Sequence, residues 1–206
     1  MAVVLPGVYC VTKDKPYEAE SSYYLDFQIQ SALISIQYLE SKTDISDTYF
    51  QSKAEYYHFY TDHLLFSLGQ ISNRFLFTNK DTEIDKERKN INRRNFQFTE
   101  EKYPILSDKK ARNTIEHIDE YDNQTILKLG GVGGFNYIDS DTDEVLAAEL
   151  RNRRTTHIYT LDLIKSELLI FKNNTEVTVN LKELKQEIIS LQTDVKWLLN
   201  MATSTY

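Results

Sequence analysis

Apolar residues recur at three- and four-residue steps through most of the first half of the chain. Between Tyr17 and Leu39 this spacing predicts an amphipathic helix, since residues three and four apart share one helix face. A longer apolar stripe runs from Phe50 to Phe75. It predicts a helix of about thirty residues, or two helices with a break near Gly69.

Two further helices are predicted around the middle of the chain. A weaker apolar pattern over Ile84–Phe98 predicts the first of them, and Tyr103-Pro104 ends it because proline disfavours helix at the preceding residue. Ser107 is then expected to cap the next helix, with Asp108 in the first turn, where the helix dipole favours negative charge. That helix is expected to run to about Asp122.

The pattern changes from period 3.6 to period 2 after residue 155. Alternation over 157–163, 168–171 and 177–179 predicts strands, with Asn173-Asn174 as a tight turn between the last two. A small antiparallel sheet follows from this arrangement. Asn180 is expected to cap a terminal helix with an apolar stripe from Leu181 to Leu198.

These elements predict a mainly α fold in two parts. Residues 17–150 form an up-down helical bundle, and residues 151–206 add a small C-terminal antiparallel β-ribbon and a terminal helix. Residues 1–16 are expected to form a tail or an edge segment. The segment 123–140 holds four of the six glycines, at Gly130, Gly131, Gly133 and Gly134, and is expected to be a flexible connector.

Composition narrows the class of protein. The 206 residues carry a net charge of −7, which excludes a protein that coats nucleic acid with a wholly basic surface but allows a local basic patch. A single cysteine, Cys10, cannot form an internal disulfide, so we expect a reducing, cytoplasmic location. No apolar run approaches the roughly 18–20 residues of a membrane span, and the N-terminus lacks the pattern of a signal peptide.

Several kinds of catalytic and cofactor site find little support in the sequence. His58 and His63 are five residues apart, whereas metal pairs on a helix prefer spacings of three or four, so we expect no metal. The glycine cluster is not followed by the lysine and the serine or threonine of a phosphate-binding loop. No nucleophile elbow is present, and we expect no cofactor.

The segment from Lys109 to Glu120 carries the most informative chemistry. Asn113 and His117 are four residues apart and share a helix face, and Arg112 lies at the start of that helix. A guanidinium, an amide and an imidazole near a helix N-terminus suit a phosphate, because arginine binds its oxygens and histidine transfers protons near pH 7. Lys109 and Lys110 are candidate substrate-binding residues.

Alternative interpretations of this pattern stay open. Arg112 and Glu116 are four residues apart and would also suit a simple surface ion pair. Arg151-Asn152 with His157 has a similar spacing, but it runs toward a predicted strand and we treat it as a chance match. The window from Lys86 to Arg94 contains five basic residues and one acidic residue, and Arg151, Arg153 and Arg154 add further positive charge.

The run Arg112-Asn113-x-x-x-His117 resembles the signature of the HEPN superfamily. In that signature four to six residues separate an Arg from a His, and a polar residue, often Asn, directly follows the Arg. The resemblance covers roughly residues 17–125. It implies an all-α bundle and a metal-independent endoribonuclease, typically a homodimer whose two motif helices meet in one cleft. Such proteins often act as toxins or in phage defence, with a cognate antitoxin or regulatory protein as a possible partner.

Carried over to this chain, the resemblance implies a role for each motif residue. Arg112 would hold the scissile phosphate of RNA, and His117 would act as general base or acid for attack by the 2′-hydroxyl. Asn113 would orient His117 or the phosphate. The alternative is a non-catalytic HEPN-like helical module whose acidic, tyrosine-rich surface binds another protein.

Overall fold

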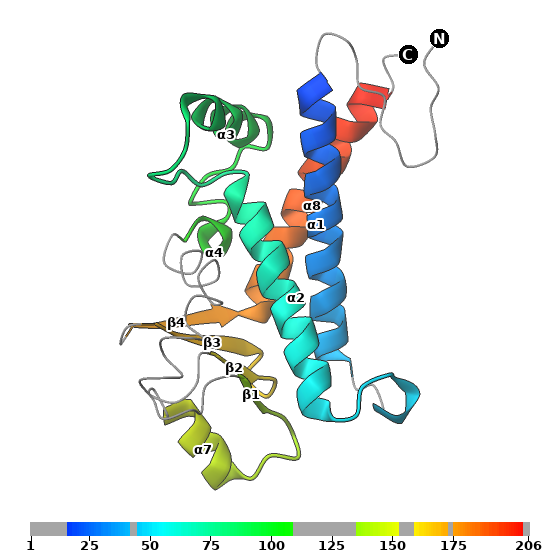
Figure 1. Ribbon diagram of the computed structural model, residues 1–206, viewed down its shortest axis with the longest axis vertical. Helices are drawn as coiled ribbons and strands as arrows, with labels where there is room; N and C mark the ends of the chain where they lie inside the picture. Colours follow the sequence, from blue (N-terminus) through cyan, green and yellow to red (C-terminus); the bar gives the residue numbers. More distant parts are fainter. Residues whose placement is uncertain (1–15, 42–44, 109–134, 153–158, 173–174, 204–206) are drawn as a thin grey trace.

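The computed structural model describes residues 16–41, 45–108, 135–152, 159–172 and 175–203 as a mainly helical fold with a small four-stranded sheet (Figure 1). The helices are α1 (Pro16–Glu40), α2 (Lys53–Asn73), α3 (Glu83–Asn95), α4 (Pro104–Ser107), α7 (Glu144–Asn152) and α8 (Leu181–Thr203), with a 3₁₀ helix at Ile45–Asp47. The strands are β1 (Phe135–Ile138), β2 (Tyr159–Asp162), β3 (Glu167–Lys172) and β4 (Thr175–Asn180). The predicted mainly α class is thereby confirmed. No helix in these ranges is both long and apolar enough to cross a membrane.

Helices α1 and α2 form an antiparallel pair. The rings of Tyr38 and Tyr60 stack with centroids 4.5 Å apart near one end of the pair, and the guanidinium of Arg74 lies over the Tyr24 ring near the other. The Ser31 hydroxyl and the His63 Nε2 are 2.7 Å apart between these two contacts. The pairing follows from the apolar stripes expected on both helices, because each stripe must be covered by a neighbour.

Helix α2 is continuous but shorter than expected. It begins after Ser52, whose side chain accepts a hydrogen bond from the Glu55 amide, and so Phe50 lies before the helix. Gly69 is buried inside α2 and does not break it, which corrects the two-helix alternative. Phe75 lies beyond the C-terminal end of α2 and is fully buried.

Helix α3 confirms the third predicted helix. Thr82 and Asp85 form a reciprocal capping box at its start, in which each side chain bonds the backbone of the other.

The expected N-cap at Ser107 is wrong, since Ser107 is the last residue of α4 and its hydroxyl donates to the carbonyl of Pro104. The helix expected over 108–122 lies almost entirely outside the described residues.

The sheet has the order β1-β2-β3-β4, and it is mixed rather than a purely antiparallel ribbon. Strands β2, β3 and β4 pair in antiparallel register, as predicted. Strand β1 pairs in parallel with β2, Phe135 opposite Tyr159 and Ile138 opposite Asp162. Residues 135–138 were expected to belong to a flexible connector, and their assignment to a strand corrects that expectation.

The terminal helix α8 closes the core against α1. The Asn180 side chain accepts hydrogen bonds from the amides of Lys182 and Glu183, which confirms the predicted cap. One buried apolar cluster contains side chains of α1, α2, β2, β3, β4 and α8. Residues on both sides of the boundary predicted at residue 150 therefore pack in a common core.

Candidate functional site

The five predicted site residues lie outside the described residues. They are Lys109, Lys110, Arg112, Asn113 and His117, and all of them fall within 109–134. The structure does describe the chain up to residue 108 and again from residue 135. The contacts of these two flanks determine how the segment that carries the predicted site is attached to the fold.

The chain before this segment is bound to α8, and we call residues 102–107 the α4 junction. The buried carboxylate of Glu187 accepts hydrogen bonds from the amide of Ile105 at 2.9 and 3.1 Å and from the amide of Leu106 at 2.9 Å. These donors are the free N–H groups at the first turn of α4. Burial raises the pKa of Glu187, although the two amide donors act in the opposite direction.

A second carboxylate of α8 also binds the α4 junction. Asp194 Oδ2 accepts a hydrogen bond from the Tyr103 hydroxyl at 2.8 Å and pairs with Lys102 Nζ at 2.6 Å. The Tyr103 ring is fully buried and stacks on Phe98, with centroids 5.0 Å apart. Burial raises the pKa of the Tyr103 hydroxyl. Two acidic side chains of α8 thus hold the chain directly before Asp108.

The chain after the segment is bound to α2 and β2. The His58 ring stacks on Phe135, with centroids 5.1 Å apart, and Tyr57 contacts Tyr137. Strand β1 is further held by its pairing with β2. Both flanks of residues 109–134 are therefore attached to the packed core, one on α8 and one on α2 and β2.

A lysine reinforces the second attachment. Lys53 Nζ donates to Asp139 at 3.3 Å and to Asp141, in the loop that follows β1. These hydrogen bonds raise the pKa of Lys53 well above its usual range. Burial acts to raise the pKa of Asp139, but hydrogen bonds from Thr142, the Asp141 amide and Lys53 lower it overall.

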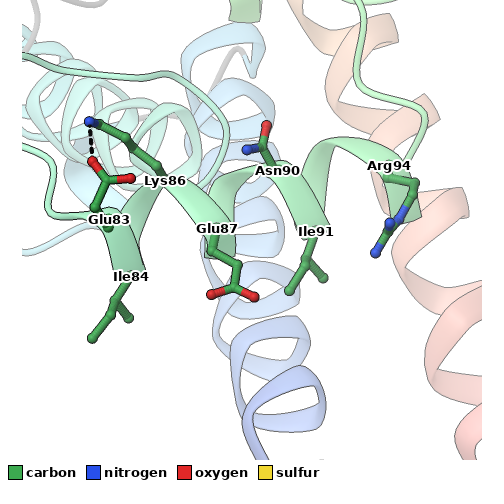
Figure 2. Close-up of a pocket in the computed structure, with 7 residues that line it drawn as sticks. All are labelled: Glu83, Ile84, Lys86, Glu87, Asn90, Ile91 and Arg94. Atoms are coloured by element: carbon green, nitrogen blue, oxygen red, sulfur yellow. Dashed lines mark hydrogen bonds and ion pairs between the residues drawn. The ribbon is translucent and has the colours of Figure 1, made fainter.

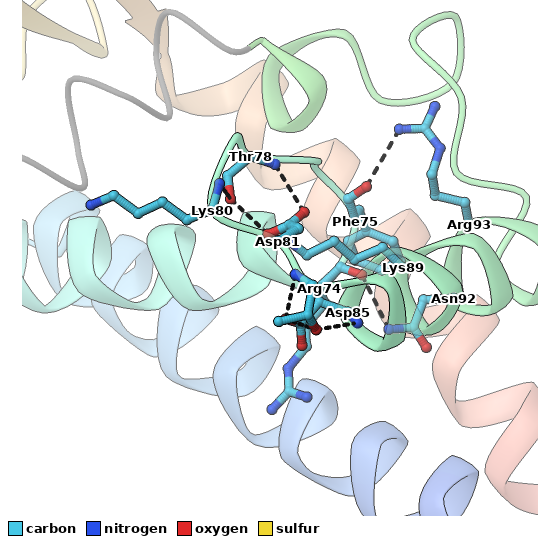
Figure 3. A network of polar contacts seen from close by, with 10 residues as sticks. Arg74, Phe75, Thr78, Lys80, Asp81, Asp85, Lys89, Asn92 and Arg93 are labelled. Atoms are coloured by element: carbon cyan, nitrogen blue, oxygen red, sulfur yellow. Dashed lines mark hydrogen bonds and ion pairs between the residues drawn. The ribbon is translucent and has the colours of Figure 1, made fainter.

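Two of the five basic residues in the window of α3 are engaged inside the fold (Figure 3). Lys89 Nζ lies 2.8 Å from both oxygens of Asp81, and both side chains are almost fully buried. Burial acts to raise the pKa of Asp81, but hydrogen bonds from Lys89 and Thr78 hold it well below its usual range. Arg93 donates to the carbonyl of Phe75 at 3.5 Å. These two basic groups bind the loop between α2 and α3 and do not form a free cationic surface.

The outer face of α3 carries a shallow depression with a volume of about 580 Å³ (Figure 2). Its lining residues all come from this one helix: Glu83, Ile84, Lys86, Glu87, Asn90, Ile91 and Arg94. Lys86 pairs with Glu83 at 2.7 Å. Because no second element contributes polar groups, the depression lacks the convergent donors and acceptors of a catalytic pocket.

Another basic residue of the predicted patch has a structural partner. Arg151 Nε donates at 2.7 Å to Asp162, whose side chain is fully buried in β2. Asp162 also accepts a hydrogen bond from the amide of Lys165. This pair joins α7 to the sheet, so Arg151 is bound within the fold. Arg153, Arg154 and His157 lie outside the described residues.

Two histidine pairs on α2 emerge only from the structure. His58 Nε2 is 3.2 Å from Asp62, which also accepts a hydrogen bond from the Tyr159 hydroxyl. His63 bonds Ser31 and stacks on Phe59. The four-residue step from His58 to Asp62 is a sequence signal that predicts such a pair. Across the described ranges, no group of three or more His, Cys, Asp or Glu side chains could hold a metal ion.

Comparison with known proteins adds no assignment. No protein-family model matches the chain, and no curated protein or solved structure is significantly similar to it. The candidate site therefore depends on the motif in the sequence and on the way its flanks are attached to the fold.

Proposed function

We propose that this chain is a cytoplasmic, metal-independent endoribonuclease that acts as a homodimer, with Arg112 and His117 as its reacting side chains. The proposal is carried by one observation. The motif Arg112-Asn113-x-x-x-His117 lies on a segment whose N-terminal flank is bound to α8 by Glu187 and Asp194. A catalytic motif needs such support, because reacting groups must be held in a defined geometry.

Each residue of the motif has a role in this reaction. Arg112 holds the non-bridging oxygens of the scissile phosphate, and His117 accepts the proton of the attacking 2′-hydroxyl. The bond between phosphorus and the 5′-oxygen breaks, and the 5′-oxygen takes up a proton from water. The other product ends in a 2′,3′-cyclic phosphate. Asn113 orients His117 or the phosphate, and Lys109 and Lys110 bind neighbouring phosphates of the RNA.

Charge distribution supports a small phosphate site and not a broad RNA-binding surface. The chain has a net charge of −7, and Lys89, Arg93 and Arg151 are bound to partners within the fold. We therefore expect the positive charge that binds RNA to come mainly from a short segment such as 109–112. Such limited RNA contact suits an enzyme with a restricted target, as in a toxin or a phage-defence protein with a cognate antitoxin or regulatory partner.

A second candidate function is a non-catalytic helical module that binds another protein. The observation that favours it is a set of large apolar side chains exposed on α1 and α2, including Phe27, Ile34, Phe59 and Phe66. A surface of this kind is typical of a protein interaction site. It is compatible with an enzyme as well, so the activity must be measured directly.

The test is cleavage of labelled single-stranded RNA in the presence of EDTA. We expect the wild type to cleave, with products that end in a 2′,3′-cyclic phosphate, and we expect Arg112→Ala and His117→Ala each to lower the rate by about 10²–10⁴-fold. Arg94→Ala is the matched control, since it replaces an exposed arginine elsewhere in the chain. No cleavage by the wild type, or equal cleavage by all four proteins, would contradict the proposal.

A further inference from the structure

Helices α1 and α2 expose an apolar surface on the side opposite the core. On α1, core contacts are made by Leu25, Ile29 and Ile36, whereas Phe27 is 57% exposed and Ile34 is 49% exposed. On α2, Phe59 is 51% exposed and Phe66 is 57% exposed. Exposure of half of a large apolar side chain to water is unfavourable in free energy unless another molecule covers it.

The four side chains lie on one face of the helix pair. Phe27 and Ile34 are four residues before and three residues after Ser31, and Phe59 and Phe66 have the same spacing about His63. Residues at these steps lie on the same helix face. Because Ser31 and His63 are hydrogen bonded at 2.7 Å between the antiparallel helices, the four side chains surround this pair, Phe27 level with Phe66 and Ile34 level with Phe59. We call this surface the α1/α2 face.

The size of the α1/α2 face is close to that of a dimer interface. Tyr23 and Tyr38 extend it along α1 and are each about two-fifths exposed. With roughly 200 Å² for each large side chain, these six residues expose on the order of 600 Å². A monomer tolerates exposed apolar patches of about 300–600 Å², and a standard interface takes about 800 Å² from each partner.

The charge of the α1 part of this face points to a protein partner. Helix α1 contains no lysine or arginine, and its exposed residues from Tyr23 to Tyr38 include no charged side chain. RNA requires lysine and arginine for its phosphates, and this stripe provides none. The centre of a protein interface, in contrast, is depleted of charge and enriched in aromatic residues.

The spacing of the side chains is self-complementary. Consider a dimer whose two-fold axis runs across both helices at the level of Ser31 and His63. Each helix then packs antiparallel against the same helix of the partner subunit. This arrangement brings Phe27 against Ile34 of the partner subunit and Phe59 against Phe66 of the partner subunit. An isologous dimer needs a surface of this kind, in which the same patch matches itself after rotation.

We propose that the α1/α2 face is the interface of a homodimer in which α1 packs antiparallel against α1 of the partner subunit. The proposal does not depend on the proposed function, because it is argued from this face alone and not from the motif at Arg112 to His117. It is tested without RNA, so that loss of dimerisation and loss of cleavage are separate results.

The first test is the mass in solution, measured by light scattering after size exclusion at micromolar concentration. We expect twice the 24.1 kDa of the chain for the wild type and a single chain for the double variant Phe27→Asp/Phe66→Asp. Ile84→Asp replaces an exposed apolar residue of α3 and should stay dimeric. Far-UV circular dichroism checks that each variant is folded. A monomeric wild type, a folded double variant that stays dimeric, or equal disruption by Ile84→Asp would overturn the proposal.

The second test places a cysteine near the proposed axis. In a Cys10→Ser background, Gln30→Cys lies within one residue of the axis level, whereas Gln37→Cys lies about 9 Å from it at 1.5 Å per residue. The two thiols introduced at position 30 would therefore meet across the axis. The two introduced at position 37 would be about 18 Å apart, beyond the reach of a disulfide. We expect mild oxidation to cross-link Gln30→Cys into a covalent dimer and to leave Gln37→Cys uncross-linked. The reverse result, or no cross-link in either variant, would overturn the proposal.

Discussion

The carboxylate of Glu187 lies 2.9 Å from the backbone nitrogen of Leu106, across 81 positions of sequence. This hydrogen bond joins the longest packed helix of the C-terminal part, α8, to the short helix α4. Because α4 ends at Ser107, the contact fixes the chain two residues before the segment that contains Arg112 and His117. It supports the chain shortly before the predicted site.

Removal of the Glu187 carboxylate should therefore destabilise the α4 junction. Glu187→Leu leaves the partly buried amide of Ile105 and the buried amide of Leu106 without an acceptor, and we expect a loss of about 1–3 kcal/mol in the free energy of unfolding. Glu187→Gln retains one acceptor oxygen and should cost about 1 kcal/mol. Urea denaturation of the two variants checks the order. If the junction supports the site, RNA cleavage falls in the same order.

Glu183→Gln is the control for this series. Glu183 lies one turn earlier on α8, and its side chain is exposed. We expect a change of less than about 0.5 kcal/mol in the free energy of unfolding. A loss in Glu183→Gln as large as that in Glu187→Leu would show that charge on α8, and not the contact with α4, determines the stability.

The buried pair of Asp81 and Lys89 predicts a specific response to acid. The pKa of Asp81 is lower in the folded state than the value near 3.9 of an unfolded chain, so the unfolded chain takes up the proton first as the pH falls. The stability from this carboxylate is thus present above about pH 4 and is lost below it. The thermal unfolding temperature of the wild type, measured between pH 6 and pH 2.5, should therefore fall steeply at the acid end of this range.

In Asp81→Asn, the unfolding temperature should fall less steeply as the pH is lowered. At neutral pH the variant leaves Lys89 buried without its charge partner, and we expect a loss of about 3–5 kcal/mol. Glu87→Gln is the matched control, since it removes an exposed carboxylate of α3. Its unfolding temperature should depend on pH in the same way as that of the wild type. Identical pH dependence in Asp81→Asn and the wild type would contradict the role given to Asp81.

Replacement of Arg151, which pairs with Asp162, distinguishes a structural arginine from the proposed catalytic Arg112. Arg151→Met leaves a fully buried carboxylate unpaired, and we expect the free energy of unfolding to fall by about 3–5 kcal/mol. The rate of RNA cleavage per folded molecule should not change, in contrast to Arg112→Ala. Arg94→Met, at an exposed position, should change neither quantity. A selective loss of cleavage in Arg151→Met would favour the second motif, with His157, over the first.

The long helices could be predicted because their signals are local. Leu25, Ile29, Ala32 and Ile36 repeat at the period of a helix, and each faces the core as that period requires. The caps at Asn180 and at Thr82 likewise depend on residues within three positions. In these segments the sequence pattern and the packed structure agree.

Strand β1 could not be predicted in the same way. Its four residues, Phe135 to Ile138, show little alternation, and the strand is stabilised by parallel pairing with β2 more than twenty positions later. The local pattern of a short segment next to glycines does not distinguish a strand from a loop. The expected connector was wrong at these four residues because the decisive contacts are distant in sequence.

The polar contacts that support the site are also distant in sequence. No local pattern links Glu187 to Ile105, Tyr103 to Asp194 or Lys53 to Asp139. The window of α3 also carries less free positive charge than its sequence indicates, because Lys89 is paired with Asp81, which lies outside that window. The motif from Arg112 to His117 stays a prediction from sequence and resemblance.

Salt dependence tests whether RNA contacts are confined to the segment 109–112. With single-stranded RNA, each phosphate contact contributes about −0.7 to the slope of log affinity against log salt, so Lys109, Lys110 and Arg112 together predict a slope near −2. Lys109→Ala/Lys110→Ala should reduce its magnitude by about 1.4. Lys86→Ala, which removes a lysine already paired with Glu83, should leave it unchanged. A much steeper wild-type slope, or equal loss in both variants, would place the RNA on a broader surface that includes α3.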